Sequence, residues 1–211
     1  MMKTIAILVI FLGTMSAQEL SPAAVLENVR AQYSHMNDVS ALFTQNVKMK
    51  FKRNGQSATG MVKIKKGNRY RLETEQQTIV TDGKTIWMYN PRTKQVLRDV
   101  YKQNRVQFSP DKFLLGLPKE FTALSLEKDS SDIILTLQPS QSGTTSSMMT
   151  GLRVWVNPAT WMFHSLEITD KNSTVTRFDL TDIRFNKGIA DAEFMFTVTP
   201  EMKVVDMQSL K

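Results

Sequence analysis

The stretch IVTDGKTIWMYNP, from Ile79 to Pro91, decides the fold of this chain. At its centre the turn Asp82-Gly83-Lys84 joins two runs rich in Ile, Val, Trp and Tyr. Asp-Gly between such runs is a strong hairpin signal, because glycine adopts a positive φ without steric cost. Side chains alternate along a strand, so Trp87 shares one face with Tyr89, whereas Ile86 points to the other. Both faces are therefore apolar, which is typical of a strand between two apolar layers or beside an apolar cavity.

Further strands are expected on both sides of this hairpin. The clearest alternation is that of Val62 and Ile64 with the lysines beside them, which indicates one buried and one solvated face. The expected strands are residues 42–53, 59–66, 69–74, 95–100, 133–138, 152–156, 161–169, 174–185 and 193–198, in addition to the hairpin over 79–89. They predict a mainly β, α+β fold: a strongly curved sheet or unclosed antiparallel β-barrel with helices covering its open face.

Two helices are expected from their start signals. Ser21-Pro22 and Ser109-Pro110 each place a favoured N-cap before a proline at the first helical position. The first helix carries an apolar stripe at three- and four-residue spacing and ends at Asn37-Asp38. The second ends at Gly116-Leu117-Pro118 and is apolar over residues 113–115, so a stable position for it requires burial or an apolar partner.

The N-terminus has the features of an export signal. Lys3 supplies the positive charge, Ile5 to Gly13 an apolar core, and Ser16-Ala17 a cleavage site with small residues. We therefore expect residues 1–17 to be a cleaved signal peptide and residues 18–211 to form a single domain. The apolar run is too short to anchor the protein in a bilayer. The mature protein is expected to be free in the periplasm.

Composition excludes several classes of function. The chain has no cysteine, so thiolate metal sites, cysteine catalysis and an N-terminal lipid anchor are excluded, and packing must replace disulfides. The formal net charge is +7, with Lys and Arg dispersed along the expected strands. This dispersion indicates solvated sheet faces or transient contact with acidic partners or anionic headgroups. Because the protein is exported, nucleic acid is not expected as a partner.

Catalytic chemistry has little support in the sequence. The two histidines, His35 and His164, have no His, Asp or Glu at metal-ligand spacing. Asp179 and Asp182 are close in sequence, but their spacing places them on opposite faces of a strand, so a paired-acid site is not expected. No phosphate loop, dinucleotide fingerprint, nucleophile elbow or zinc motif is present. We expect no enzyme, metal or cofactor, although a hydrolase that uses His164 is a testable alternative.

Two adjacent methionines stand in a loop of small residues, Ser140 to Thr150. Methionine is flexible and polarizable, so it suits adaptable apolar contacts. We expect Met148-Met149 to border the mouth of an apolar cavity and to contact cargo or a partner. The alternative is an exposed loop without a function in binding.

Four runs carry a resemblance to a known family: Leu42-Phe43-Thr44-Gln45, residues 60–66, residues 81–91 and residues 191–200. The most specific is 81–91, in which DGKT precedes an aromatic residue, then Tyr and Asn-Pro. In this order they span nearly all of the mature chain. They resemble the outer-membrane lipoprotein carrier family, LolA.

The resemblance implies an unclosed β-barrel whose mouth is covered by helices and which encloses an apolar cavity. It further implies a periplasmic chaperone that takes lipoproteins from an inner-membrane transporter and passes them to an outer-membrane acceptor. No bond is made or broken in this function, so catalytic residues are not required. We expect a monomer.

The resemblance also assigns residues to the cavity and its lid. The lid positions are Leu26, Val29 and Tyr33 on the first helix and Phe113, Leu114 and Leu115 on the second, and the cavity wall is assigned to Phe43, Tyr70, Leu72, Ile79 and Trp87. An arginine that clamps the lid in the family corresponds to Lys66 here. Lysine has no planar fork, so a clamp at this position is expected to be weaker or replaced by another contact.

A second function fits the same cavity. The protein could carry a free lipid or glycolipid, or sense envelope stress through a partner, instead of carrying lipoproteins. Lipid extraction from the natively purified protein separates these alternatives.

Overall fold

The computed structural model of the chain describes residues 20–50, 55–102, 110–140 and 149–207. The predicted signal peptide, residues 1–17, lies outside these ranges, and so does Met148 of the predicted mouth loop. Within the described part of the chain, no helix combines the length and the apolar character that crossing a bilayer requires.

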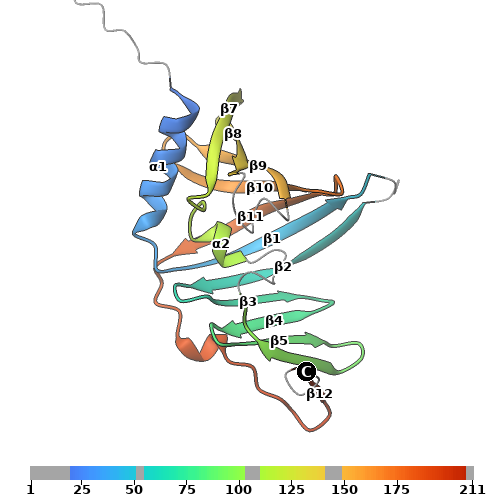
Figure 1. Ribbon diagram of the computed structural model, residues 1–211. Coiled ribbons are helices and arrows are strands. Elements are labelled where there is room, and N and C mark those ends of the chain that lie inside the picture. The colour runs from blue at the N-terminus through green and yellow to red at the C-terminus, as the bar shows by residue number, and fades with distance from the viewer. Residues whose placement is uncertain (1–19, 51–54, 103–109, 141–148, 208–211) are drawn as a thin grey trace, which may run out of the picture.

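The described elements are three helices and twelve strands (Figure 1). In chain order they are α1 (Pro22–Ser34), β1 (Asp38–Lys48), β2 (Gln56–Lys65), β3 (Arg69–Thr74), β4 (Thr78–Asp82), β5 (Thr85–Asn90), β6 (Gln95–Val100), α2 (Pro110–Leu114), β7 (Phe121–Asp129), β8 (Asp132–Pro139), β9 (Met149–Asn157), β10 (Met162–Asp170), β11 (Val175–Phe185), the 3₁₀ helix η1 (Asp191–Phe194) and β12 (Lys203–Asp206).

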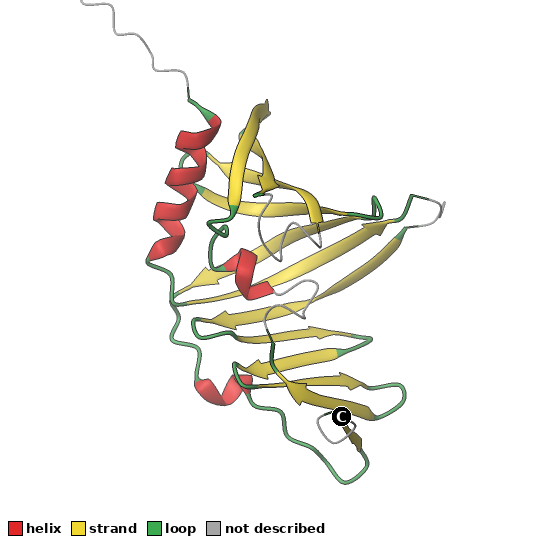
Figure 2. Ribbon diagram, in the orientation of Figure 1, coloured by secondary structure: helices red, strands yellow, loops and turns green. Residues whose placement is uncertain are grey.

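All twelve strands belong to one sheet, in the order β12-β6-β5-β4-β3-β2-β1-β11-β10-β9-β8-β7. Every pairing is antiparallel except that of β12 with β6, which is parallel. In the described residues the sheet does not close, because β12 and β7 remain at its two ends. The predicted mainly β, unclosed architecture with helices over one face is confirmed (Figure 2).

The two α-helices cover the same face of the sheet, which we call the helical face. Helix α1 packs against β7, β8 and β10, and α2 packs against β2 and β3. Ser21 caps α1 as predicted, since its hydroxyl accepts a hydrogen bond from the Ala24 amide at 3.2 Å and Pro22 follows it. The buried stripe of α1, which includes Val29 at 0% exposure, joins the main hydrophobic core beneath the helices.

The predicted hairpin over 79–89 forms through β4 and β5. Gly83 has a φ of 91°, and a Cβ there would lie 2.4 Å from the Gly67 carbonyl oxygen, so no other residue fits without a backbone shift. Asp82 accepts hydrogen bonds from the amides of Lys84 and Thr85 at 2.8 and 2.7 Å. The turn is therefore fixed by its own sequence.

A second buried layer lies on the other side of the sheet, which we call the outer face. Val80, Val96 and Phe194 are 0% exposed, yet they do not belong to the core beneath α1 and α2. Phe194 comes from η1, which packs on β3 and β4. The segment 189–206, here called the strap, thus covers the outer face over β3 and β4 and ends in β12 at the sheet edge.

Three expectations about the strands are wrong. Residues 193–198 do not form a strand: the chain makes the 3₁₀ helix η1 and then runs on without regular structure. Strands β7 and β12 were not expected, because neither has a strong apolar alternation. The first strand begins four residues earlier than expected, at Asp38, and ends at Lys48.

Candidate functional site

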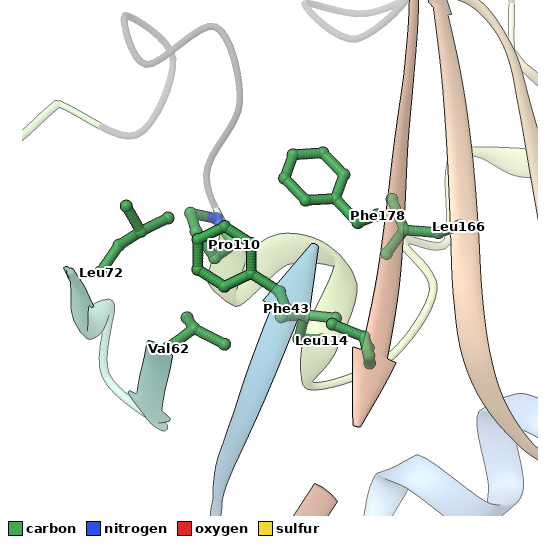
Figure 3. Close-up of a pocket in the computed structure, with 8 residues that line it drawn as sticks. Phe43, Val62, Leu72, Pro110, Leu114, Leu166 and Phe178 are labelled. Atoms are coloured by element: carbon green, nitrogen blue, oxygen red, sulfur yellow. The ribbon is translucent and has the colours of Figure 1, made fainter. Parts of the chain in front are cut away.

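An apolar pocket lies on the helical face, between the sheet and α2 (Figure 3). It receives side chains from five strands and from α2, so it joins residues that are far apart in sequence. All 8 lining residues are apolar: Phe43, Val62, Leu72, Pro110, Leu114, Leu166, Phe178 and Leu180.

Strand register brings the pocket floor together. Phe43 of β1 lies opposite Leu180 of β11 on one side and Gly60 of β2 on the other. A Cβ on Gly60 would lie 2.8 Å from the Phe43 ring and 2.1 Å from the Glu73 carbonyl oxygen. Glycine at this position therefore leaves room for the Phe43 ring, which lies 6.2 Å from the Phe178 ring.

Tyr33 fixes the C-terminal end of α1 to the sheet. Its ring stacks on Phe163 with centroids 4.8 Å apart, and its hydroxyl hydrogen-bonds both the amide and the carbonyl of Phe163 at 3.3 and 3.4 Å. Burial raises the pKa of the Tyr33 hydroxyl, against the smaller opposing effect of the Phe163 backbone. The hydroxyl therefore stays protonated, and α1 is held by packing together with a neutral hydrogen bond.

Arg30 connects α1 to the chain that follows α2. Its Nη2 donates hydrogen bonds to the carbonyl oxygens of Pro118 and Phe121 at 2.8 and 2.9 Å, and its Nη1 pairs with Glu27. Among the described residues, its buried Nε has no hydrogen-bond partner. An unpaired buried donor costs about 1–3 kcal/mol, so it offsets part of what the two hydrogen bonds contribute.

Lys66, the predicted lid clamp, makes a more limited contact. Its Nζ donates one hydrogen bond to the Ser34 carbonyl oxygen, at the end of α1, at 3.1 Å. This contact is exposed, and it reaches α1 but not α2. Arg30 makes two hydrogen bonds to the chain that follows α2, whereas Lys66 makes one exposed hydrogen bond, so the sequence prediction missed the more extensive contact.

The pocket is nearly filled by its own side chains. Its free volume is about 10 Å³, which is about the space that one water molecule occupies. Sites that hold lipid-sized or drug-sized ligands usually measure about 300–1,000 Å³. The expected apolar cavity is therefore closed in this conformation, in which Leu114 and Pro110 of α2 fill the space.

Most of the predicted cavity residues lie on the helical face, but only some line the pocket. Phe43, Leu72 and Leu114 line it directly. Tyr70 and Ile79 lie in the same core but outside the lining, as do the α1 residues Leu26, Val29 and Tyr33. Phe113 packs edge-on against Phe121 with centroids 6.2 Å apart, and Leu115 is half-buried against the core.

Trp87 lies elsewhere, and its assignment to the cavity wall is wrong. It pairs with Val80 of β4, whereas Ile79 pairs with Met88, so Trp87 and Ile79 point to opposite faces. Trp87 belongs to the outer face, together with Val80 and Arg98.

The sequence prediction also missed residues that line the pocket. Leu166, Phe178 and Leu180 contribute its far wall from β10 and β11. Their alternation with polar neighbours was visible, but nothing local showed that β11 pairs with β1 and brings Phe178 next to Phe43. Met149, part of the predicted mouth loop, is buried at 5% exposure at the start of β9, in the main core.

One polar cluster on the outer face involves His164. Its Nε2 lies 3.0 Å from Asp132 and its Nδ1 lies 3.4 Å from the Ser165 hydroxyl, a combination of residue types used in nucleophilic catalysis. However, Ser165 is 2% exposed and donates its hydrogen bond to Asp179 at 2.6 Å. Its proton is thus committed to a carboxylate rather than to the histidine, so the cluster stabilises the sheet.

The part of the chain that the structure describes contains no candidate metal site. No three His, Cys, Asp or Glu side chains there come together in a way that could hold an ion. The apolar pocket is the candidate site because its lining is wholly apolar, and such a lining can bury apolar groups.

The fold and the pocket define a class: an open, mostly antiparallel sheet with two helices on one face and an apolar pocket closed by one of them. The sequence profile of the outer membrane lipoprotein carrier protein LolA matches residues 34–197. The chain therefore belongs to the LolA family.

Individual relatives agree with this assignment. An outer-membrane lipoprotein carrier protein of Haemophilus influenzae strain Rd is 27% identical over 200 residues, which cover 93% of this chain and 94% of the relative. One of Pasteurella multocida strain Pm70 is 34% identical over 99 residues, 46% of each chain. The solved structure of an uncharacterized conserved protein from Thermus thermophilus has a TM-score of 0.53 at 11% identity, covers 86% of this chain and 96% of its own, and shares the fold.

Proposed function

We propose that this protein is a periplasmic carrier that shields the acyl chains of lipoproteins in the pocket beneath α2. In this function it receives lipoproteins from an inner-membrane transporter and delivers them to an outer-membrane acceptor. Membership of the LolA family supports the carrier function, and the relatives are named as carriers rather than as enzymes. The single observation that carries the proposal is the wholly apolar lining of the pocket.

The chemistry of the cargo explains why such a lining is needed. Each methylene taken out of water contributes about 0.8 kcal/mol, so a lipoprotein with several long alkyl chains needs tens of kcal/mol of shielding to cross an aqueous compartment. An apolar wall supplies this shielding without requiring the cargo to form hydrogen bonds. It also accepts chains of different length and orientation, because the hydrophobic effect is non-directional and depends on the apolar area that is buried.

Loading requires that the pocket open, since its free volume is about 10 Å³. We infer that α2 moves away from the sheet and that acyl chains take the place of Leu114 and Pro110. Helix α2 has only 5 residues, and the two side chains with which it closes the pocket are apolar. Apolar contacts with the cargo replace the apolar contacts that α2 loses, so the free-energy change of this exchange is small.

Arg30 is placed to control this movement. Opening that separates α1 from residues 118–121 breaks its two hydrogen bonds to carbonyl oxygens. It also allows water to reach the unpaired Nε, which lowers the net cost of opening. Together these two effects give the closed state a moderate stability. The empty pocket stays shielded from water, yet α1 and residues 118–121 can still separate.

The proposal is tested by mixing the purified protein with inner-membrane vesicles that contain the transporter and a lipoprotein. The wild-type protein is expected to bring the lipoprotein into the soluble fraction. Leu114→Glu is expected to lower this yield at least tenfold, because it places a charge in the lining. Leu124→Glu is the matched control: Leu124 is 54% exposed on β7 and should tolerate the same change.

An equal yield from Leu114→Glu and wild type would contradict the proposal. Mass spectrometry of organic extracts distinguishes the alternative function. If the native protein contained a bound free lipid or glycolipid and formed no soluble lipoprotein complex, its function would be lipid transport or sensing instead of lipoprotein transport.

A further inference from the structure

The turn between β5 and β6 meets the strap at one end of the sheet, where β12 begins. Asn90 holds this turn, since its side-chain oxygen accepts hydrogen bonds from the amides of Arg92 and Thr93 at 3.0 and 3.2 Å. The Lys203 amide donates to the Lys94 carbonyl oxygen at 2.9 Å, and β12 then continues along β6. Two segments that are far apart in sequence are thus joined at a fixed corner.

The side chains at this corner are basic and solvent-exposed. Arg92, Lys94 and Lys203 are all exposed. Val198 of the strap and Val204 of β12 are each 45% exposed, so exposed apolar side chains lie close to Lys203 in sequence, with Val204 on the opposite side of β12 from Lys203. We call these five residues the basic corner.

The nearby carboxylates do not neutralise the basic corner. Asp206 lies 3.6 Å from Arg98 and pairs with that residue. Glu201 accepts a hydrogen bond from the Thr199 hydroxyl and feels the charge of Lys94. The three exposed cations outnumber these two carboxylates, one of which pairs with Arg98, so the corner keeps a positive charge.

Four other cations on the outer face are held in ion pairs. Lys63 pairs with Glu193 at 2.7 Å, and Lys65 and Arg69 pair with Asp191 at 2.6 and 2.7 Å. Arg71 pairs with Glu73 at 2.6 Å. The strap thus shields the positive charge in the middle of the outer face and leaves it accessible at the basic corner.

We infer that the basic corner docks the protein transiently on membranes that contain anionic phospholipids. Cations beside exposed apolar side chains match such a surface, because the phosphates attract the charge and the interface accepts the valines. Each Lys or Arg close to an anionic membrane strengthens binding about fivefold, so three give weak, reversible attachment. A carrier that must leave the membrane again requires attachment of this strength.

The position of the basic corner in the fold is compatible with this function. Strand β12 lies at the end of the sheet opposite to β7, whereas α1 packs against β7, β8 and β10 (Figure 1). Docking through the corner therefore leaves α1 and its Arg30 contacts away from the bilayer.

The test is binding of the cargo-free protein to lipid vesicles at low salt. Sedimentation should show binding to phosphatidylcholine vesicles with phosphatidylglycerol added, and at least tenfold weaker binding to phosphatidylcholine alone. The triple variant Arg92→Gln, Lys94→Gln, Lys203→Gln is expected to bind the anionic vesicles about 100-fold more weakly. Circular dichroism checks that it folds, which is expected because all three side chains are exposed.

The matched control is Lys128→Gln, Lys171→Gln, Lys187→Gln, which removes the same charge from exposed positions on other parts of the surface. It should weaken binding less than threefold. Equal weakening by both triple variants would show that only the net charge matters and would overturn the inference, as would a lack of preference for anionic vesicles. Because no lipoprotein is present, this result is independent of the transport assay.

Discussion

Both faces of the sheet carry a buried layer, but the two layers are covered in different ways. On the helical face, α2 closes the pocket with the apolar side chains of Pro110 and Leu114. On the outer face, the strap adds Phe194 at 0% exposure, ion pairs from Asp191 and Glu193, and the β12 ladder. A cover that is attached by apolar contacts can be replaced by apolar cargo, whereas one attached by ion pairs and backbone hydrogen bonds cannot. This difference supports the proposal that the helical face is the one that opens.

The largest effect is expected from weakening the outer cover. Phe194→Ala removes a fully buried ring and should lower the free energy of unfolding by about 3–5 kcal/mol. Leu114→Ala on the helical face should cost about 2 kcal/mol, the lower end of the range for buried leucine, because α2 relaxes toward the sheet more easily. Urea unfolding of the two variants measures the difference. A larger loss from Leu114→Ala would reverse the comparison.

A smaller effect is expected from Arg30. Arg30→Gln removes the two hydrogen bonds to the carbonyls of Pro118 and Phe121 and should cost about 2 kcal/mol. It should also increase uptake of an environment-sensitive apolar dye, because α1 and the chain that follows α2 separate more easily. Lys66→Gln loses one exposed hydrogen bond and should change stability by less than about 1 kcal/mol.

The comparison of these two variants decides which residue holds the lid. Arg30→Lys is the conservative control, since it keeps the charge but not the fork and should lie between wild type and Arg30→Gln. If Lys66→Gln increased dye uptake more than Arg30→Gln, the clamp would belong to Lys66.

The smallest effect concerns pH. Hydrogen bonds from Lys65 and Lys63 lower the pKa of the Asp191 and Glu193 carboxyls from 3.8 and 4.5, respectively. A carboxyl whose pKa is lower in the folded state stabilises the fold above its unfolded pKa. This contribution is lost as the pH falls through the folded value. Strap stability should therefore be constant near neutral pH and decrease as the pH falls below about 4.5.

Amide hydrogen exchange of residues 191–206, measured from about pH 6 to about pH 3, tests this dependence. The exchange rates are first corrected for the intrinsic effect of pH. The double variant Asp191→Asn, Glu193→Gln should remove most of the extra opening at low pH. An unchanged pH dependence in that variant would show that the ion pairs do not hold the strap.

Sequence patterns were sufficient where local chemistry determines the structure. The Asp82-Gly83 turn, the Ser21 cap and the alternation of Val62 and Ile64 each depend on residues close in sequence. Together with the resemblance, they predicted the mainly β open sheet under two helices and the LolA family, which the comparisons confirmed.

The wrong predictions concern features that depend on contacts between segments far apart in the sequence. Both faces of the β4–β5 hairpin are apolar, so alternation could not show that Trp87 lies on the outer face while Ile79 faces the helices. Likewise, Phe194 and Phe196 are spaced as in a strand, so a strand was predicted over residues 193–198. Asp191 and Glu193 instead bind cations on β2 and β3, and this draws the chain across the strands.

The most direct test of the central claim is photo-crosslinking of a bound lipoprotein. A photoreactive amino acid replaces Phe178, on the pocket floor, or Trp87, on the outer face of the same sheet. The account predicts crosslinks to the acyl chains from position 178 and none from position 87. Acyl crosslinks from position 87 alone would contradict it, because the cargo would then bind the face that the strap covers.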